Sequence, residues 1–201
     1  MKKKPTRKQH YVPQVYLKGF SNCGNMINAY WSDNNGIIKE KCVPIESICR
    51  ENYLYELKND SNELIAINYI EKCLSVIEGE FSEYRNILLK KAFNEKYKET
   101  KCFFSAEEKD FWTLYIGFQM LRTPNVLNEA KSFSRDYFGE SLGGNLSDNI
   151  AILQCLPFLK EKELGEQNCF LSFIKPMLEM SIALGVDSKG RIITSDNPVY
   201  P

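Results

Sequence analysis

The chain has 201 residues, a length that suits one domain, and a domain of this size buries roughly 70% of the surface of its unfolded chain. Apolar residues make up 43% of the composition and charged residues 26%, which excludes an intrinsically disordered protein. Basic and acidic side chains are equal in number, at 26 each, so net charge indicates neither a nucleic-acid nor a membrane partner.

The first nine residues, MKKKPTRKQ, are basic and are expected to form a flexible tail. Such a tail is usually a solvated end, and the alternative is an arm that contacts the phosphates of a nucleic acid or nucleotide. His10 follows, where this polar start meets the apolar residues of HYVPQVYLKGF. It is the single histidine of the chain, and its imidazole has an ordinary pKa near neutrality.

Two strands are predicted at 26–31 and 36–43, because the Asn-Gly pair between them is a strong turn signal. A short strand is expected at 53–57. A long helix is predicted at 63–91, where apolar residues recur every three or four positions. Glu78 lies at the edge of this apolar stripe, either as a partner for a guanidinium of the next helix or as a solvated side chain.

The stretch 105–124 carries the clearest helix signals in the chain. Ser105 and Glu108 form the capping-box pattern at its start, and Pro124 ends it. At 100° per residue, Arg122 falls in the same narrow arc as three aromatic residues of this helix. A guanidinium within a buried stripe needs a partner or an opening to water, so Arg122 is the best single indication of a site.

Helices are predicted at 125–137 and 147–159, and the apolar stretch 169–174 fits either a helix or a strand. Strands at 177–186 and 191–194 flank a turn signal and predict a second hairpin. The chain then reads SDNPVYP, in which Ser, Asp and Asn beside proline favour a tight turn.

These elements predict an α+β fold. Residues 10–201 are expected to form one helix-rich domain, in which the N-terminal and C-terminal β-hairpins make a small antiparallel sheet on about three to five helices. The hairpins could share one sheet or form two. The helices at 63–91 and 105–123 are expected to pack as an antiparallel pair.

The seven scattered cysteines contain no C-x-x-C pair, which argues against a disulfide framework and for the reducing cytoplasm. A single histidine argues against zinc, so a metal would be a hard, oxygen-bound ion such as magnesium. No apolar run approaches the ~20 residues that span a bilayer, and no signal peptide is recognisable. The chain is therefore expected to have no membrane partner.

Three separated motifs stand out: HYVPQVYLKGF at 10–20, QMLRTP at 119–124 and IITSDNPV at 192–199. In this order and spacing they resemble DUF4238, a bacterial family of unknown function, and the resemblance covers nearly the whole chain. Members that resemble this chain usually continue with further strands past SDNPV. The resemblance therefore implies a chain shortened at its C-terminus, as a natural product or a fragment. The family carries no established activity to transfer.

The motifs supply candidate catalytic and binding residues, and Glu78 of the predicted helix at 63–91 joins them. The catalytic candidates are His10, Arg122 and Asp196, and the binding candidates are Glu78, Gln119, Ser195 and Asn197. His10 would move a proton, Arg122 would bind an anion in two bonds, and Asp196 would orient the imidazole or hold a metal. The first hypothesis is thus a hydrolase or nuclease-like enzyme acting on a phosphate-containing substrate.

The second hypothesis is a non-catalytic binding or interaction protein. In this interpretation Arg122 pairs inside the core with Glu78 or Asp196, and the other residues complete a structural polar network. A sheet edge left open by missing C-terminal strands would then accept the strand of a partner.

Overall fold

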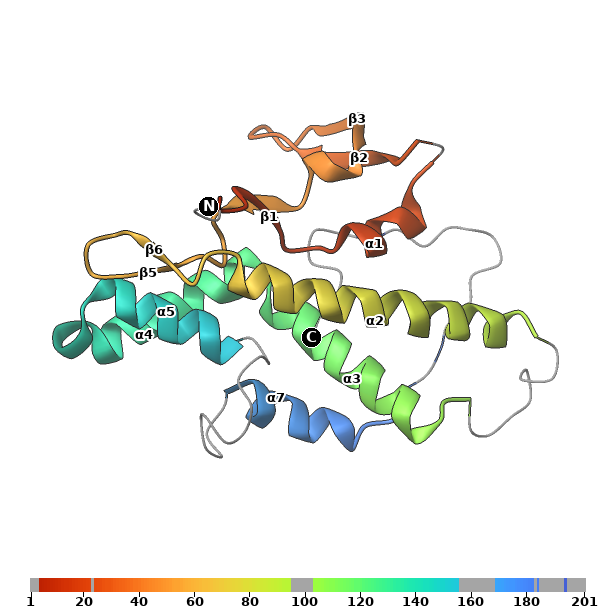
Figure 1. Ribbon diagram of the computed structural model, residues 1–201. Helices are drawn as coiled ribbons and strands as arrows, with labels where there is room; N and C mark the ends of the chain where they lie inside the picture. Colours follow the sequence, from red (N-terminus) through yellow and green to blue (C-terminus); the bar gives the residue numbers. More distant parts are fainter. Residues whose placement is uncertain are drawn as a thin grey trace.

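The computed structural model describes residues 4–22, 24–94, 103–155, 169–182, 184 and 194. Within these residues the chain folds into several helices and small antiparallel sheets, and the predicted α+β class is confirmed (Figure 1). The strands of the described part pair two by two. The pairs are β1 (Lys8–His10) with β4 (Arg50–Asn52), β2 (Met26–Ser32) with β3 (Ile38–Pro44), and β5 (Leu57–Lys58) with β6 (Leu64–Ile65).

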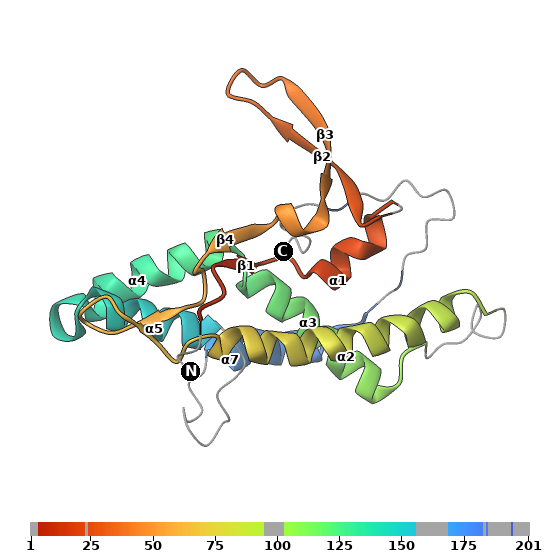
Figure 2. The same cartoon turned by 45° about the horizontal axis from the view of Figure 1, so that its top comes forward.

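The predicted N-terminal hairpin is the β2–β3 pair, which stands away from the helices (Figure 2). Its turn is held by the carboxylate of Asp33, which accepts hydrogen bonds from the main-chain N–H of Asn35 at 2.9 Å and of Ile37 at 3.0 Å. This is the local side-chain bonding that makes aspartate a turn residue. Its strands end within two residues of the predicted limits.

From Lys4 onward, the chain before His10 is bonded to the rest of the protein and is not a free tail. Strand β1 pairs with β4, and the side chain of Asn68 donates to the main-chain oxygen of Lys4 at 3.0 Å. The side chain of Gln9 is only 1% exposed and donates to Glu56 at 2.9 Å. The basic side chains that the structure describes here, Lys4, Arg7 and Lys8, are exposed while the backbone is paired. A prediction from side-chain charge alone misses that pairing.

The helices of the described chain carry most of the structure. They are α1 (Gln14–Leu17), α2 (Tyr69–Ala92), α3 (Ala106–Leu121), α4 (Pro124–Leu142), α5 (Gly144–Cys155) and α7 (Cys169–Leu178), with 3₁₀ turns at Lys18–Phe20 and Ile45–Ser47. The predicted helix at 63–91 begins later, at Tyr69. Ala66 and Asn68 have φ of +50° and +59°, which a right-handed helix does not allow, and β6 occupies part of the preceding stretch.

The predictions for the second half of the chain have different outcomes. The helix predicted at 125–137 runs on through Gly139 and ends where Gly143 takes φ of +79°. The ambiguous stretch at 169–174 is helical in α7, and so are Met177 and Leu178, which were expected to begin a strand. Most of the second predicted hairpin, including 185–193, lies outside the described residues.

Helices α2 and α3 form the predicted antiparallel pair. Lys91 at the end of α2 meets Glu108 at the start of α3, while Glu78, nearer the start of α2, meets Arg122 after the end of α3. The capping box is also confirmed, because Ser105 Oγ accepts from the N–H of Glu108 and the Glu108 carboxylate accepts from the N–H of Ser105. The N-terminal segment, residues 4–22 with β1 and α1, lies on one side of the α2–α3 pair, and α7 lies on the other side (Figure 1).

The main core lies where the turn before β5 meets α2, α3, α4, α5 and α7. Its buried residues are Leu54, Tyr55, Leu57, Ile70, Leu74, Phe118, Leu127, Ile152, Cys155 and Ile174. Helix α7 approaches α3 closely at Gly117, since a Cβ on this glycine would lie 1.8 Å from the Cδ1 atom of Ile174. The absence of a side chain at Gly117 therefore sets the spacing of these two helices.

Replacing Gly117 by alanine should lower the free energy of unfolding by about 1–3 kcal/mol, because the added methyl group overpacks the α3–α7 contact. Gly79→Ala in α2 is the control, since nothing lies within 4 Å of its Cβ position, and it should gain about 1 kcal/mol of helix propensity. Urea titration measures both changes. Equal stability of Gly117→Ala and the wild type would contradict the close approach of α7.

Candidate functional site

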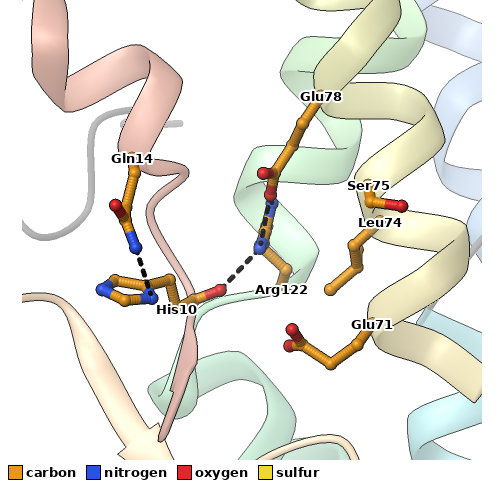
Figure 3. A pocket seen from close by; sticks show the side chains of 7 residues that line it. All are labelled: His10, Gln14, Glu71, Leu74, Ser75, Glu78 and Arg122. Atoms are coloured by element: carbon orange, nitrogen blue, oxygen red, sulfur yellow. Dashed lines mark hydrogen bonds and ion pairs between the residues drawn. The ribbon is translucent and has the colours of Figure 1, made fainter. Parts of the chain in front are cut away.

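A pocket of about 160 Å³ opens between the N-terminal segment and the α2–α3 pair (Figure 3). Seven residues line it: His10, Gln14, Glu71, Leu74, Ser75, Glu78 and Arg122. They come from three separate segments of the chain. The pocket thus brings together three of the candidates proposed from the sequence, namely His10, Glu78 and Arg122.

Helix α2 supplies one whole wall of the pocket. Residues 71, 74, 75 and 78 are spaced three, four and seven positions apart, which places them on one face of a helix. Leu74 anchors this face in the core, where it is buried. Glu71 and Glu78 lie two helical turns apart, so one carboxylate stands near each end of the wall.

Arg122 lines the buried side of the pocket and is only 1% exposed. Its Nη2 atom donates to the main-chain oxygen of His10 at 2.6 Å, and its Nη1 atom donates to Glu78 Oε1 at 3.3 Å. Its Nε atom donates to the hydroxyl of Tyr55 at 3.4 Å, and that hydroxyl donates to the main-chain oxygen of Arg122 at 3.0 Å. The guanidinium thus joins three distant parts of the chain.

These bonds occupy nearly all the hydrogens that a guanidinium can donate. Nη2 also approaches Glu78 Oε1 at 3.4 Å, and the Cζ atom of Arg122 lies 5.0 Å from the ring centre of Phe118. Burial alone would lower the pKa of Arg122, but the nearby Tyr55 and Glu78 outweigh it and raise that pKa. Arg122 therefore stays charged, and its donors face the protein acceptors of His10, Glu78 and Tyr55.

The two glutamates of the pocket differ in their partners. Burial raises the pKa of Glu78, and the positive charge of Arg122 opposes this rise. Burial raises the pKa of Glu71 to about 7, against the attraction of Arg122 and with the repulsion of Glu78 and Glu56. Glu71 has no hydrogen bond or ion pair to any residue that the structure describes. Its carboxyl group is thus half-protonated near neutral pH.

His10 contributes both its main chain and its ring. While its carbonyl group accepts from Arg122, its Nδ1 atom lies 3.4 Å from the side-chain nitrogen of Gln14. Its Nε2 atom is buried without a hydrogen bond of ordinary geometry to the described residues. Burial lowers the pKa of His10, the charges of Arg50 and Arg122 lower it further, and Glu46 partly opposes them. The ring is therefore neutral at pH 7.

Gln119 does not line the pocket, although it belongs to the motif that contains Arg122. Its side chain is only 3% exposed, and neither atom of its amide bonds to a residue in the described chain. The buried hydroxyl of Tyr115, one turn earlier on α3, has no partner in that part of the chain either. Burial raises the pKa of Tyr115, so this phenol stays neutral.

Ser195, Asp196 and Asn197 lie outside the described residues. Thr194, which precedes them, is described, and its Oγ1 atom lies 3.0 Å from the hydroxyl of Tyr16. The ring of Tyr16 packs against Phe81 on α2, with 6.3 Å between ring centres. The predicted approach of Asp196 to His10 stays a prediction.

Two further expectations concern a metal ion, for which magnesium is the candidate, and a membrane, for which no partner is expected. No group of three or more His, Cys, Asp or Glu side chains that could hold a metal ion occurs among the described residues. The prediction of magnesium therefore rests on the sequence alone. None of the helices in the described ranges has the length and apolar character to cross a bilayer.

The family model whose description is "Protein of unknown function (DUF4238)" matches residues 8–200. The chain belongs to the DUF4238 family. The family resemblance of the three motifs is thereby confirmed across almost the full sequence. No curated protein and no solved structure matches this DUF4238 chain.

Motifs and helical periodicity predict part of this DUF4238 pocket and miss the rest. His10, Glu78 and Arg122 were found, whereas Gln14, Glu71 and Ser75 were not. A signal for Glu71 does exist, because it stands seven residues before Glu78 and shares its helix face. Gln14 lies four residues after His10, and nothing in the sequence marks it as a pocket residue beyond its place in the HYVPQ motif.

Proposed function

We propose that this DUF4238 chain is a hydrolase whose acid–base site is the pocket between the N-terminal segment and α2. The supporting observation is the carboxyl group of Glu71, which faces the pocket without a protein partner in the described chain and has a pKa of about 7. A group with such a pKa can both accept and donate a proton at neutral pH. Perturbed titratable groups in a pocket are typical of active sites.

Three polar residues of the pocket have distinct roles in this proposal. Glu71 takes a proton from the attacking water and returns it to the leaving group. His10 is a neutral ring whose Nδ1 atom accepts a hydrogen bond, at present from Gln14. Arg122 is a positioning residue, because it holds Glu78 and the main chain of His10 in place rather than touching the substrate.

The pocket supports the acid–base part of the sequence hypothesis more than its phosphate part. Binding of a phosphate by Arg122 would need donors that are already bonded to His10, Glu78 and Tyr55. Two carboxyl groups, Glu71 and Glu78, face the same space and would repel an anion. The predicted part of Asp196 in catalysis remains open to direct test by Asp196→Asn.

The test is hydrolysis of model ester, amide, glycoside and phosphodiester compounds by the wild type and two variants. Glu71→Gln should lower the rate on the accepted class by about 10²–10⁴-fold, as expected for the loss of a general acid–base group. Glu80→Gln, an exposed neighbour on α2, should keep the wild-type rate. Full activity of Glu71→Gln, or inactivity of the wild type on all four classes, would argue against a hydrolase.

A non-catalytic binding or interaction protein is the second candidate function. It is favoured by the pairing of Arg122, which joins the main chain of His10, the ring of Tyr55 and the carboxylate of Glu78 as a structural network would. In that case Glu71→Gln would change stability alone, and no compound of the hydrolysis panel would react.

A nucleic-acid or nucleotide partner in the cytoplasm is the remaining prediction. Lys4, Arg7 and Lys8 have exposed side chains close together in sequence, which supports a phosphate contact outside the pocket. Binding of a fluorescent single-stranded oligonucleotide should then weaken steeply with added salt and more so in Arg7→Gln/Lys8→Gln. Binding that is insensitive to both changes would contradict this contact.

A further inference from the structure

We infer that the pocket binds an organic cation, namely the ammonium or guanidinium group of a small molecule, between Glu71 and Glu78. This inference names the substrate class of the proposed hydrolase and rests on that proposal only for turnover. The binding itself rests on the hydrogen-bonding groups, the charges and the size of the pocket.

The pocket offers many hydrogen-bond acceptors and few free donors. Glu71 brings two carboxyl oxygens with no bond to the described chain, and Glu78 accepts from Arg122 through Oε1 alone. The Ser75 hydroxyl donates its proton to the main-chain oxygen of Lys72 at 2.7 Å, which leaves its oxygen as an acceptor. A ligand that brings several N–H donors therefore satisfies groups that the protein leaves unbonded.

Most of the donors that line the pocket are already in use, and the exception is His10 Nε2, which carries the ring hydrogen when Nδ1 accepts from Gln14. The amide nitrogen of Gln14 faces His10 Nδ1, and the Nη atoms of Arg122 face Glu78 and the His10 carbonyl group. Beyond the hydrogen on His10 Nε2, an anionic or acceptor-rich ligand would have to compete with these bonds. Ammonium and guanidinium groups carry donors and no acceptors, so they match what remains.

The charges around the pocket favour a cation as well. Arg122 neutralises one of the two pocket glutamates, and Glu71 adds a second negative charge once it ionises. His10, on the opposite wall, is neutral at pH 7 because burial and two arginines lower its pKa. Glu56 adds repulsion from the turn before β5. A bound cation would relieve the repulsion among these carboxylates.

The dimensions limit the size of the bound group. A volume of about 160 Å³ is small beside the ~300–1,000 Å³ of pockets that enclose whole drug-sized ligands. It suits a head group with a short chain. Leu74, the apolar residue of the lining, lies between the two glutamates in sequence and can cover the first methylene groups of that chain.

The experiment is isothermal titration calorimetry of the full chain with four probes at constant ionic strength. Butylammonium and butylguanidinium should bind, whereas butanol and butyrate, which lack the cationic head, should not. Affinity for the cations should be about tenfold higher at pH 8 than at pH 6, because Glu71 titrates at about 7 and must ionise to pair. Glu71→Gln should lower the affinity at pH 8 at least tenfold, while Glu80→Gln should leave it unchanged.

Several results would overturn the inference: no binding of either cation, equal or tighter binding of butyrate, or cation binding unchanged in Glu71→Gln. The outcome also separates this inference from the proposed function. If the pocket binds the cations but the protein hydrolyses no amine- or guanidine-bearing ester, amide, glycoside or phosphodiester, the cation-binding inference holds and the proposed hydrolase activity is rejected. If the protein hydrolyses a neutral compound but binds neither cation, the hydrolase activity holds and the cation-binding inference is rejected.

Discussion

Replacing Arg122 by methionine is expected to lower the free energy of unfolding by about 3–5 kcal/mol, the cost of removing one partner from a buried ion pair. Methionine fills a similar length but leaves the His10 carbonyl group without its donor and Glu78 without its cation. Arg122→Lys should also be destabilised, because a single ammonium cannot reach acceptors spread over three segments. Guanidinium or urea titration at pH 7 measures both losses.

The surface of the same protein provides a matched control. Arg135 pairs with Asp148 through two bonds, but its side chain is 55% exposed, so Arg135→Met should cost no more than about 1 kcal/mol. A double-mutant cycle of Arg122→Met with Glu78→Gln isolates the energy of the buried pair. A loss below about 1 kcal/mol for Arg122→Met would contradict its role as the link between the three segments.

Replacing Glu71 by glutamine should change how stability depends on pH. The pKa of Glu71 in the folded chain is about 7, above its ordinary value of 4.5, so the folded state binds more protons between these two values. The stability from this group is therefore fully present below pH 4.5 and lost as pH rises through 7. Glu71→Gln removes this loss and should be more stable than the wild type at pH 8.

The expected gain at pH 8 is on the order of 1–2 kcal/mol once solvent screening of the partly exposed carboxylate is allowed for. Denaturant titrations at a series of pH values measure the difference between the two chains, and Glu80→Gln should follow the wild-type curve because it is exposed. Parallel curves for Glu71→Gln and the wild type would show that Glu71 titrates normally. A gain at pH 8 would identify a group kept at a cost to stability, as active-site groups often are.

The sequence predicted those parts of the fold that depend on local chemistry. The capping box at Ser105 and the antiparallel pairing of α2 with α3 follow from residue types and from helical periodicity. The late start of α2 did not follow, because Ala66 takes a positive φ that its side chain does not favour. The pairing of β1 with β4 was missed because it joins main-chain groups forty or more residues apart in the sequence, and such bonds leave little trace in composition.

The same distinction holds for the candidate site. The pairing of Arg122 with Glu78 was one of two alternatives for a guanidinium on an apolar stripe, and the structure confirms it. The bond from Arg122 to the His10 carbonyl group could not be predicted, because every residue has such an oxygen. Glu71 was missed since its importance comes from what lies opposite it in space, on the N-terminal segment.

The bond between Arg122 and His10 spans 112 residues, which has a consequence for synthesis of the chain. At about 5–20 residues per second, a ribosome adds Arg122 on the order of ten seconds after His10. During that interval the N-terminal segment lacks the guanidinium that holds it against α2. The pocket is thus absent from every nascent chain that stops before Arg122, and the segment around His10 gains this bond only after another 112 residues have been added.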